Sequence, residues 1–314
     1  MPDTRVKVLY IAGCGRSGST LLARLLGQAD GWVSAGELIS IWSRGVLGDW
    51  PCDCGERFTA CPHWKAVFDQ TWGGLDRVDA RLASQTDRRL RAQLLPTLLR
   101  TPRDRRYTSA DCEPYKQITQ QLYAGLAALN GSRVVVDSSK FAKYALFLDR
   151  LPEIDLRVVH LVRDSRAVSF SYFRPIPRHP GASAGNHLRT HGVAGSSQLW
   201  LRENLSAEAL KAVGIPYVRM RYEDLCRDPA PFLQRVADFV GEGPLGLAVK
   251  DRSTFEIRPT HGPSGNPSRF RTGDVTVRED NEWTAKMKTS NTVLSTLLTW
   301  PLLARYGYVR RGRG

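Results

Sequence analysis

Short runs of apolar residues recur along the chain, and each run ends in polar residues. They lie at the start of residues 6–26 and in residues 133–140, 156–164 and 217–222. β-Branched residues are common in these runs, which favours β-strands. Helix-forming stretches separate them, and apolar strands that alternate with helices predict a parallel sheet covered on both faces. We therefore expect a three-layer α/β/α fold with a central parallel sheet, whose ligands bind at the carboxyl ends of the strands.

The stretch between the first two runs is mainly helical. Leucines recur at helical spacing in residues 65–130, for example Leu90 and Leu94, and a charged loop, TPRDRR, interrupts them at residues 101–106. We interpret this stretch as a helical excursion within one domain that spans residues 1–314, a length that can bury a full core.

Residues 6–26, VKVLYIAGCGRSGSTLLARLL, combine a strand, a glycine-rich turn and a helix. The glycines let successive N–H groups point inward, and the helix N-terminus adds partial positive charge, so the segment predicts a phosphate cradle. It has the P-loop spacing Gly13-x-x-x-x-Gly18, but Ser19 stands where a nucleotidase has lysine. The positive charge is carried by Arg16, whose planar guanidinium suits a tetrahedral oxyanion.

Two further segments carry candidate ligands for anions. In LVRDSRAVSFS, Arg163 ends a strand and Ser171 lies about two turns into the next helix, where the pair could hold a second phosphate. A local Arg163–Asp164 ion pair with a surface hydroxyl is the structural alternative. In HGPSGNPSRFR, residues 261–271, constrained turns bring Arg269 to a loop that could close over a nucleotide or form a surface turn.

Residues 50–64 concentrate three cysteines and a histidine. Cys52, Cys54, Cys61 and His63 have the spacing C-x-C-x6-C-x-H and are all residue types that bind zinc. The spacing is tighter than in common structural zinc sites, and a compact loop with buried thiols or a disulfide remains open. We assign no metal ligand on this pattern.

The charge and the hydropathy of the chain limit the kinds of partner. Its net charge of +14 favours anionic ligands, but the arginines are scattered and no nucleic-acid-binding signature is present, so we expect no nucleic-acid partner. No stretch reaches the ~20 apolar residues of a membrane span. The first residues lack a signal-peptide pattern, so we expect a cytoplasmic protein whose six cysteines are mostly reduced.

Four motifs taken together resemble a known family. GCGRSGSTLL, LVRDSRAVSFS, RYEDL and SGNPSRFR, in this order, resemble the sulfotransferases that use 3′-phosphoadenosine-5′-phosphosulfate (PAPS). The likeness is closer to the bacterial carbohydrate-type and tyrosylprotein-type branches than to the cytosolic aryl enzymes. It extends from residue 6 to about residue 308, although the helical excursion and the cysteine-rich segment carry little of it.

The resemblance implies a cofactor site made of two groups of residues, with PAPS as donor and 3′-phosphoadenosine-5′-phosphate (PAP) as product. The residues implied to bind the 5′-phosphosulfate are Gly15, Arg16, Ser17, Gly18, Ser19 and Thr20. Those implied to bind the rest of the cofactor are Arg163 and Ser171 at the 3′-phosphate, Tyr222 in the adenosine pocket, and Gly265, Asn266 and Arg269 in a C-terminal loop.

The implied reaction is in-line transfer of a sulfuryl group to an acceptor hydroxyl, which needs a base and cations. Glu37, at the end of a connector in residues 31–38, matches the catalytic glutamate of the tyrosylprotein branch and is our candidate base. A basic pocket would lower its pKa and keep it ionised. We expect Lys140 to contact the sulfuryl oxygens and Arg16 to stabilise the bridging oxygen. The alternatives are a helix-start acid for Glu37 and a surface lysine for Lys140.

Two other functions remain open from the sequence. A P-loop kinase or nucleotidase would use the loop at Gly13 and a carboxylate at Asp137, but it lacks the usual lysine partner of the β- and γ-phosphates. A non-catalytic module that binds anionic polymers would show salt-dependent binding without turnover. The acceptor of a sulfotransferase could be a small molecule, glycan, lipid or peptide, and the sequence does not reveal the oligomeric state.

Overall fold

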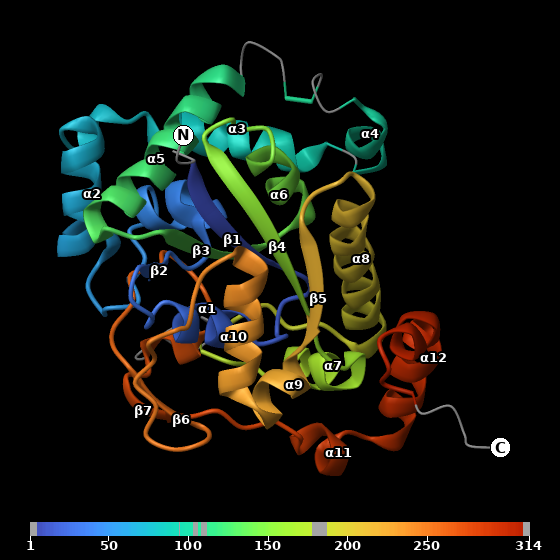
Figure 1. Cartoon of the computed structure of the whole chain (residues 1–314). Coiled ribbons are helices and arrows are strands. Elements are labelled where there is room, and N and C mark those ends of the chain that lie inside the picture. Colours follow the sequence, from blue (N-terminus) through green and yellow to red (C-terminus); the bar gives the residue numbers. More distant parts are fainter. Residues whose placement is uncertain (1–4, 94, 103–105, 108–111, 178–186, 310–314) are drawn as a thin grey trace.

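The structure, a computed structural model, describes residues 5–93, 95–102, 106–107, 112–177 and 187–309. At its centre lie five parallel strands in the order β2-β3-β1-β4-β5 (Figure 1). The strands are β1 (Val6–Ala12), β2 (Trp32–Ser34), β3 (Val134–Lys140), β4 (Ile154–Val162) and β5 (Tyr217–Arg221). The predicted α/β fold with a central parallel sheet is confirmed.

Strand β2 departs from the sequence-based expectation. Residues 31–38 were expected to form a connector, but Trp32 and Ser34 pair with Val134 and Val136 of β3. The expectation was therefore wrong for the first part of this segment. Three residues are too few for a period-two pattern of apolar side chains to stand out from the surrounding sequence.

Side chains alternate along each strand, so each strand presents residues to both faces of the sheet. Helices cover both of these faces. In β1, Val8 and Tyr10 join one buried cluster, whereas Leu9 and Ile11 join the other. The helices that pack on the Leu9 side are α1 (Ser19–Leu26), α9 (Tyr222–Arg227) and α10 (Pro229–Val240). The helices that pack on the Tyr10 side include α2 (Pro62–Trp72), α3 (Ala80–Ala92), α5 (Glu113–Asn130) and α6 (Ala142–Leu148).

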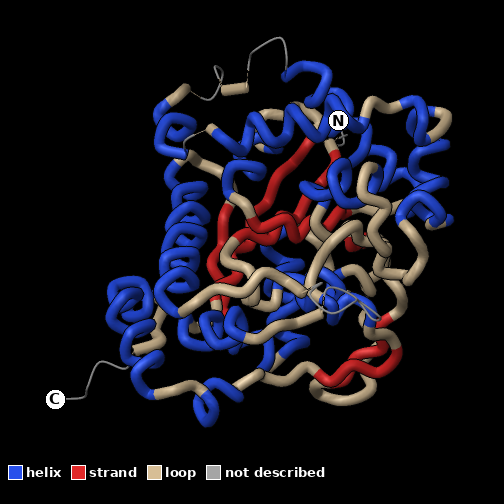
Figure 2. The backbone as a smooth tube through the Cα atoms, turned by 180° about the vertical axis from the view of Figure 1, so that it is seen from behind, coloured by secondary structure: helices blue, strands red, loops and turns tan. Residues whose placement is uncertain are grey.

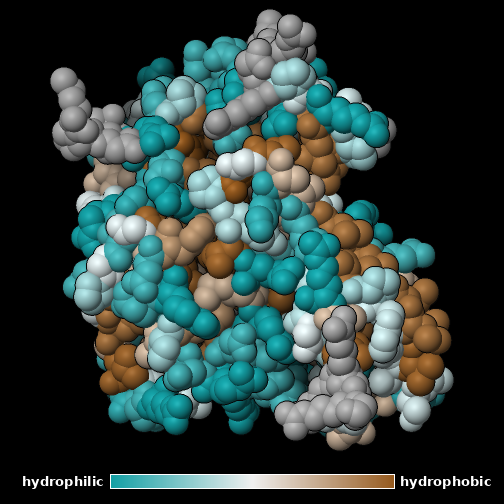
Figure 3. Space-filling model, turned by 45° about the vertical axis from the view of Figure 1, so that its right-hand side comes forward, coloured by the Kyte–Doolittle hydropathy of each residue, from teal (hydrophilic) through white to brown (hydrophobic). Residues whose placement is uncertain are grey.

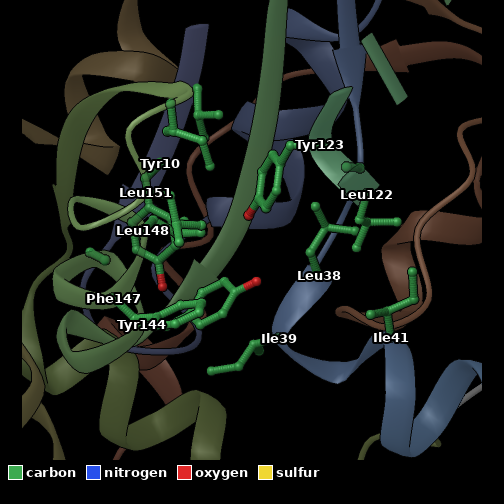
Figure 4. Close-up of a cluster of buried hydrophobic side chains, with 14 of the residues drawn as sticks. Tyr10, Leu38, Ile39, Ile41, Leu122, Tyr123, Tyr144, Phe147, Leu148 and Leu151 are labelled. Atoms are coloured by element: carbon green, nitrogen blue, oxygen red, sulfur yellow. The ribbon is translucent and has the colours of Figure 1, made fainter. Parts of the chain in front are cut away.

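The predicted helical excursion contains α2, α3, α4 (Leu95–Arg100) and α5, between β2 and β3 in the chain. Its side chains complete the Tyr10 side of the core, where Tyr123 of α5 and Tyr144 of α6 lie near Tyr10 (Figure 4). That the whole chain forms one domain stays a prediction.

The C-terminal part adds an antiparallel pair, β6 (Thr254–Ile257) with β7 (Gly273–Thr276), which lies apart from the central sheet (Figure 2). Helices α7 (Ser165–Phe173), α8 (Val193–Ala212), α11 (Glu282–Lys286) and α12 (Thr289–Arg305) lie beyond the β5 edge and below it (Figure 1).

Helix α12 is apolar on two sides. Leu302 and Leu303 pack into a small core with Trp200 of α8, as expected for a packed helix. Leu297 and Trp300 stay 69% and 49% exposed. Figure 3 turns the right-hand side of Figure 1 forward and shows hydrophobic residues on the surface there. Within the described residues, no helix has the length and apolar character needed to cross a membrane.

Candidate active site

The glycine-rich loop, residues 13–18, joins β1 to α1 and needs its glycines for close approach. Gly13 has φ +127°, and a Cβ there would lie 2.6 Å from the carbonyl oxygen of Leu161. Gly18 has φ +87°, and a Cβ there would lie 2.4 Å from the ring of Tyr222. Arg16 itself adopts φ +68°, a conformation that costs free energy in a residue with a side chain. The loop thus passes close to the end of β4 and to the ring of Tyr222.

Two buried polar groups of this loop lack a hydrogen-bond partner within the described residues. They are Nη1 of Arg16 and the hydroxyl oxygen of Ser17. The Arg16 guanidinium lies over the ring of Tyr172, 5.3 Å from its centre. Burial lowers the pKa of Arg16, and the nearby charge of Glu37 opposes that shift. Unpartnered buried donors are costly, so these groups fit an anionic ligand that would complete their hydrogen bonds.

A cleft of about 820 Å³ opens in front of this loop. Its walls come from the loop, from α1 and α7, from the start of α9, and from residues 266–282. Among the residues that the structure describes, six arginines and three carboxylates line it. The arginines are Arg16, Arg24, Arg163, Arg174, Arg271 and Arg278, and the acids are Glu279, Asp280 and Glu282. The cleft thus has an excess of positive charge, which suits a ligand with more than one anionic group.

Arg163, Ser171 and Tyr222 meet in this cleft, although they come from three different elements. The Arg163 guanidinium donates to the carbonyl oxygens of Arg16 at 3.0 Å and of Asp280 at 2.9 Å. It also stacks over the Tyr222 ring, 4.6 Å from its centre. Its Nη2 atom also lies 3.5 Å from a carboxylate oxygen of Asp280. The alternative Arg163–Asp164 pair is absent from the described ion pairs, because Asp164 instead accepts from Arg166.

The predicted C-terminal loop forms one wall of the cleft. The backbone N–H of Asn266 donates to the Thr20 hydroxyl at 3.3 Å, and Gly265 packs beside the same threonine. The Asn266 side chain caps the short helix Pro267–Phe270 by accepting from the N–H of Ser268. Arg24 of α1 donates to the carbonyl oxygen of Ser268 at 2.9 Å, so α1 and this loop form one unit.

Arg269 has a different position from the one that the sequence suggested. It is 3% exposed and is not among the residues that line the cleft. Its guanidinium pairs with Asp53 and donates to the carbonyl oxygens of Gly262 at 3.0 Å and Pro51 at 2.8 Å. The geometry therefore gives Arg269 a structural role between two loops in place of direct contact with a cofactor.

Glu37 and Lys140 form an ion pair between the segment after β2 and the end of β3. Each side chain is 14% exposed. Ser264 also donates to Glu37, at 3.2 Å, and Arg44 lies 3.9 Å away. Burial raises the pKa of Glu37, but Lys140, Arg44 and Ser264 outweigh it, so the pKa is lowered overall. Glu37 is therefore ionised at neutral pH.

The end of β3 holds this pair in place. The carboxylate of Asp137 accepts from the backbone N–H of Ser139 at 2.8 Å and from the hydroxyls of Ser139 and Tyr123. The Ser139 hydroxyl accepts from the N–H of Ile39 at 3.0 Å, two residues after Glu37. Burial raises the pKa of Asp137 to about 6. Asp137 thus orients the turn that leads to Lys140.

Glu37 and Lys140 are not among the residues that line the cleft, but they lie next to the loop that does. The N–H of Gly13 donates to the carbonyl oxygen of Lys140 at 3.3 Å, and the charge of Glu37 acts on Arg16. The Glu37–Lys140 ion pair therefore lies beside the loop that carries Arg16 into the cleft.

Comparison with known proteins decides the family. Residues 9–243 match the model of the Sulfotransferase family, which is most of the chain. The chain belongs to the sulfotransferase family. Over 154 residues it is 32% identical to human carbohydrate sulfotransferase 2, in a match that covers 38% of this chain and 28% of the human protein. The mouse protein of the same name is 32% identical over 152 residues, with the same shares of each chain.

The chain therefore spans well under two thirds of the length of these curated relatives. Among solved structures, the sulfotransferase domain of the Synechococcus PCC 7002 olefin synthase resembles this fold with a TM-score of 0.51 at 20% identity. That match covers 98% of this chain and 97% of the domain, and at this identity it shows the fold alone.

Several residues at this sulfotransferase site were missed by sequence reasoning. Arg24 lies four residues after Thr20 and so faces the same side of α1, a signal that the sequence did contain. Tyr172 stands directly after Ser171 and covers the glycine-rich loop, since a Cβ on Gly15 would lie 2.6 Å from its hydroxyl. Ser264 contacts Glu37 across 227 residues of chain, and no local pattern reveals such a contact.

His160 is a core residue of this sulfotransferase, in line with its position in an apolar strand. Its ring contacts the hydroxyl of Tyr217 at 2.6 Å and the side-chain oxygen of Asn204 at 2.8 Å. Burial lowers its pKa to about 4, so the ring is neutral at physiological pH. It is therefore no candidate for a catalytic base.

Proposed function

We propose that this sulfotransferase transfers a sulfuryl group from PAPS to the hydroxyl group of an acceptor. One observation carries the proposal: within the described part of the chain, Arg16 Nη1 and the neighbouring Ser17 hydroxyl are buried donors without partners, and Arg16 lines the basic cleft. Family membership supports the reaction class, and the missing lysine after Gly18 supports a donor without a γ-phosphate.

The residues present fit the proposed donor. At the 5′ end, the ligands would be Gly15, Arg16, Ser17, Gly18, Ser19 and Thr20, whose loop and helix N-terminus favour an anion. At the 3′ end, Arg163 and Ser171 would bind the second phosphate. Tyr222, Gly265 and Asn266 would border the adenosine. Arg24 and Arg271 line the same cleft and would add positive charge.

When bound, PAPS supplies the sulfuryl group and its phosphate leaves as part of PAP. Glu37 is ionised and accepts the proton of the acceptor hydroxyl, whose oxygen forms the new S–O bond while the S–O bond to phosphate breaks. Once Glu37 is protonated, Lys140 loses its counter-charge, and its N–H groups can hold negative charge at the reacting oxygens. Arg16 does the same from the glycine-rich loop.

The position of Asp137 supports this proposal over a kinase. A kinase or nucleotidase would need a carboxylate free to hold a magnesium ion near the phosphates. Both carboxylate oxygens of Asp137 already accept hydrogen bonds, from Ser139 and Tyr123. Asp137 is also fully buried. A kinase or nucleotidase would therefore lack the carboxylate that it needs to hold magnesium.

The test is transfer of radiolabelled sulfate from PAPS to a panel of glycan, lipid, peptide and small-molecule hydroxyls. We expect label in one acceptor class, with turnover reduced by about 10²–10⁴ in Glu37→Gln. Glu113→Gln, a change in an exposed helical pair with Lys116, is the control and should keep full activity.

Magnesium-dependent phosphoryl transfer from ATP in place of sulfuryl transfer would overturn the proposal in favour of a kinase. Salt-dependent binding of anionic polymers without turnover, unchanged in Glu37→Ala, would instead favour an anion-binding module.

A further inference from the structure

Four metal-binding side chains meet at one point outside the catalytic machinery. Cys52, Cys54 and Cys61 come from the segment before α2, and His261 comes from the loop after β6. Their ligand atoms all lie within 4.8 Å of one another. Two of these residues, Cys52 and Cys61, are fully buried.

Three of the distances between these atoms are close to those of tetrahedral zinc, and the others lie within 4.8 Å. With Zn–S bonds of about 2.3 Å and a Zn–N bond of about 2.0–2.1 Å, a tetrahedron separates two sulfurs by about 3.8 Å and a sulfur from a nitrogen by about 3.6 Å. Cys54 Sγ and Cys61 Sγ are 3.7 Å apart. His261 Nδ1 lies 3.3 Å from Cys61 Sγ and 3.9 Å from Cys52 Sγ.

The sequence pattern suggested His63 as the histidine beside the three cysteines, but in the structure the histidine of the cluster is His261. The His63 ring stacks on the ring of His261, with centres 4.4 Å apart and planes 8° from parallel. This stack orients His261, and it leaves His63 in a supporting position. His261 lies 200 residues from Cys61, so the spacing along the chain could not identify it.

We propose that Cys52, Cys54, Cys61 and His261 bind a structural zinc ion. Three thiolates and one imidazole nitrogen in tetrahedral arrangement form a set typical of zinc, and protein groups would fill all four positions. A disulfide fits less well, because the 3.7 Å between Cys54 Sγ and Cys61 Sγ far exceeds an S–S bond of about 2.05 Å. All three cysteines are free thiols.

The groups around the cluster join the same two segments, as expected around a structural metal. The N–H of Asp53, between two of the cysteines, donates to the carbonyl oxygen of Gly262 at 3.3 Å. The carboxylate of Asp53 pairs with Arg269 and accepts from the Thr260 hydroxyl at 3.0 Å. Gly262 packs against Gly36, since a Cβ on Gly36 would lie 2.7 Å from the Cα of Gly262.

The metal would therefore fix the loop that completes the active site. Ser264, which donates to Glu37, lies three residues after His261, and Asn266 lines the cleft two residues further on. Zinc at the cluster would hold this loop against Glu37 and the glycine-rich loop. The role is one of positioning, since the cluster itself is not part of the cleft lining.

The test is the metal content of the whole chain, purified without added metal and dialysed. We expect about one zinc ion per wild-type chain by elemental analysis. Cys61→Ser and His261→Asn should lose it, and His63→Asn, the matched control on the stacked ring, should keep it. Cobalt(II) exchanged into the wild-type protein should give the intense visible bands of tetrahedral thiolate coordination, which needs no variant to fold.

Wild-type protein without metal and with all six thiols titratable would overturn the proposal. So would a disulfide among the three cysteines, or full zinc occupancy in His261→Asn. Zinc loss in His63→Asn with retention in His261→Asn would overturn the assigned ligand set. None of these measurements uses PAPS, so they stand apart from the success or failure of the proposed reaction.

Discussion

Gly18→Ala tests how the glycine-rich loop is coupled to Arg163 through the ring of Tyr222. Gly18 has φ +87°, and a Cβ there would lie 2.4 Å and 2.8 Å from two ring carbons of Tyr222. Real Cβ atoms approach no closer than 3.0 Å, so the ring must shift by the difference of 0.6 Å or more. Tyr222 in turn supports the Arg163 guanidinium, 4.6 Å from the ring centre.

The expected magnitude has two parts. The left-handed backbone conformation costs alanine about 1–2 kcal/mol, which lowers the free energy of unfolding. Displacement of Tyr222 should also move Arg163, whose proposed charge-assisted hydrogen bond to the 3′-phosphate would contribute about 1.5–3 kcal/mol. Loss of that contact would raise the Kd for PAP by about ten- to a hundredfold.

A matched substitution separates the two parts. Gly241 ends α10 with φ +78°, and a Cβ there would meet nothing within 4 Å. Gly241→Ala should therefore lose stability in urea unfolding like Gly18→Ala, but calorimetric titration should show unchanged PAP affinity. Equal PAP affinity in both variants would refute the coupling of the glycine-rich loop to Arg163 through Tyr222.

Three further expectations test single residues. Arg269→Ala should lower the free energy of unfolding by about 3–5 kcal/mol, because it leaves the carboxylate of Asp53 buried and unpaired; an unfolding midpoint equal to wild type would contradict the structural role. His160 takes up a proton in the unfolded chain near pH 6.5 but in the folded chain only near pH 4, so its contribution to stability falls as the pH drops through this window. Between pH 7 and pH 5, the free energy of unfolding of the wild type should therefore fall by about 2 kcal/mol more than that of His160→Gln. Equal losses in urea unfolding at the two pH values would contradict this expectation. Since the pKa of Glu37 is lowered, the turnover rate should fall on acidification only below the ordinary glutamate pKa of 4.5, where Glu37 takes up a proton. A fall in the turnover rate already near pH 6 would indicate that another residue is the base.

Local patterns were sufficient to predict four of the five strands of the central sheet, all but β2, and one wall of the cleft. The run before Gly13 and the run that ends at Arg163 each combine an apolar strand with polar residues at its carboxyl end, and parallel pairing brings these ends together. The fold and the convergence of Arg163, Ser171 and Tyr222 on the glycine-rich loop follow from this arrangement.

Contacts between distant segments could not be predicted in the same way. Arg269 is a good cofactor ligand by residue type, but a buried carboxylate 216 residues away, Asp53, pairs with it first. His63 has the right spacing from the cysteines, yet His261 occupies the fourth position. In both cases the deciding partner comes from a loop whose placement depends on the completed fold.

The central claim is that the cleft binds a nucleotide with a 3′-phosphate and without metal. Calorimetric titration of the whole chain with PAP and with ATP, first in buffer without magnesium and then with magnesium added, tests it directly. Arg163→Ala is the site variant, and Arg202→Ala, which removes an exposed arginine paired with Glu203, is the control. We expect tight binding of PAP, weak binding of ATP, and a loss of PAP affinity in Arg163→Ala alone. No binding of PAP, or preference for ATP that appears only with magnesium, would contradict the account.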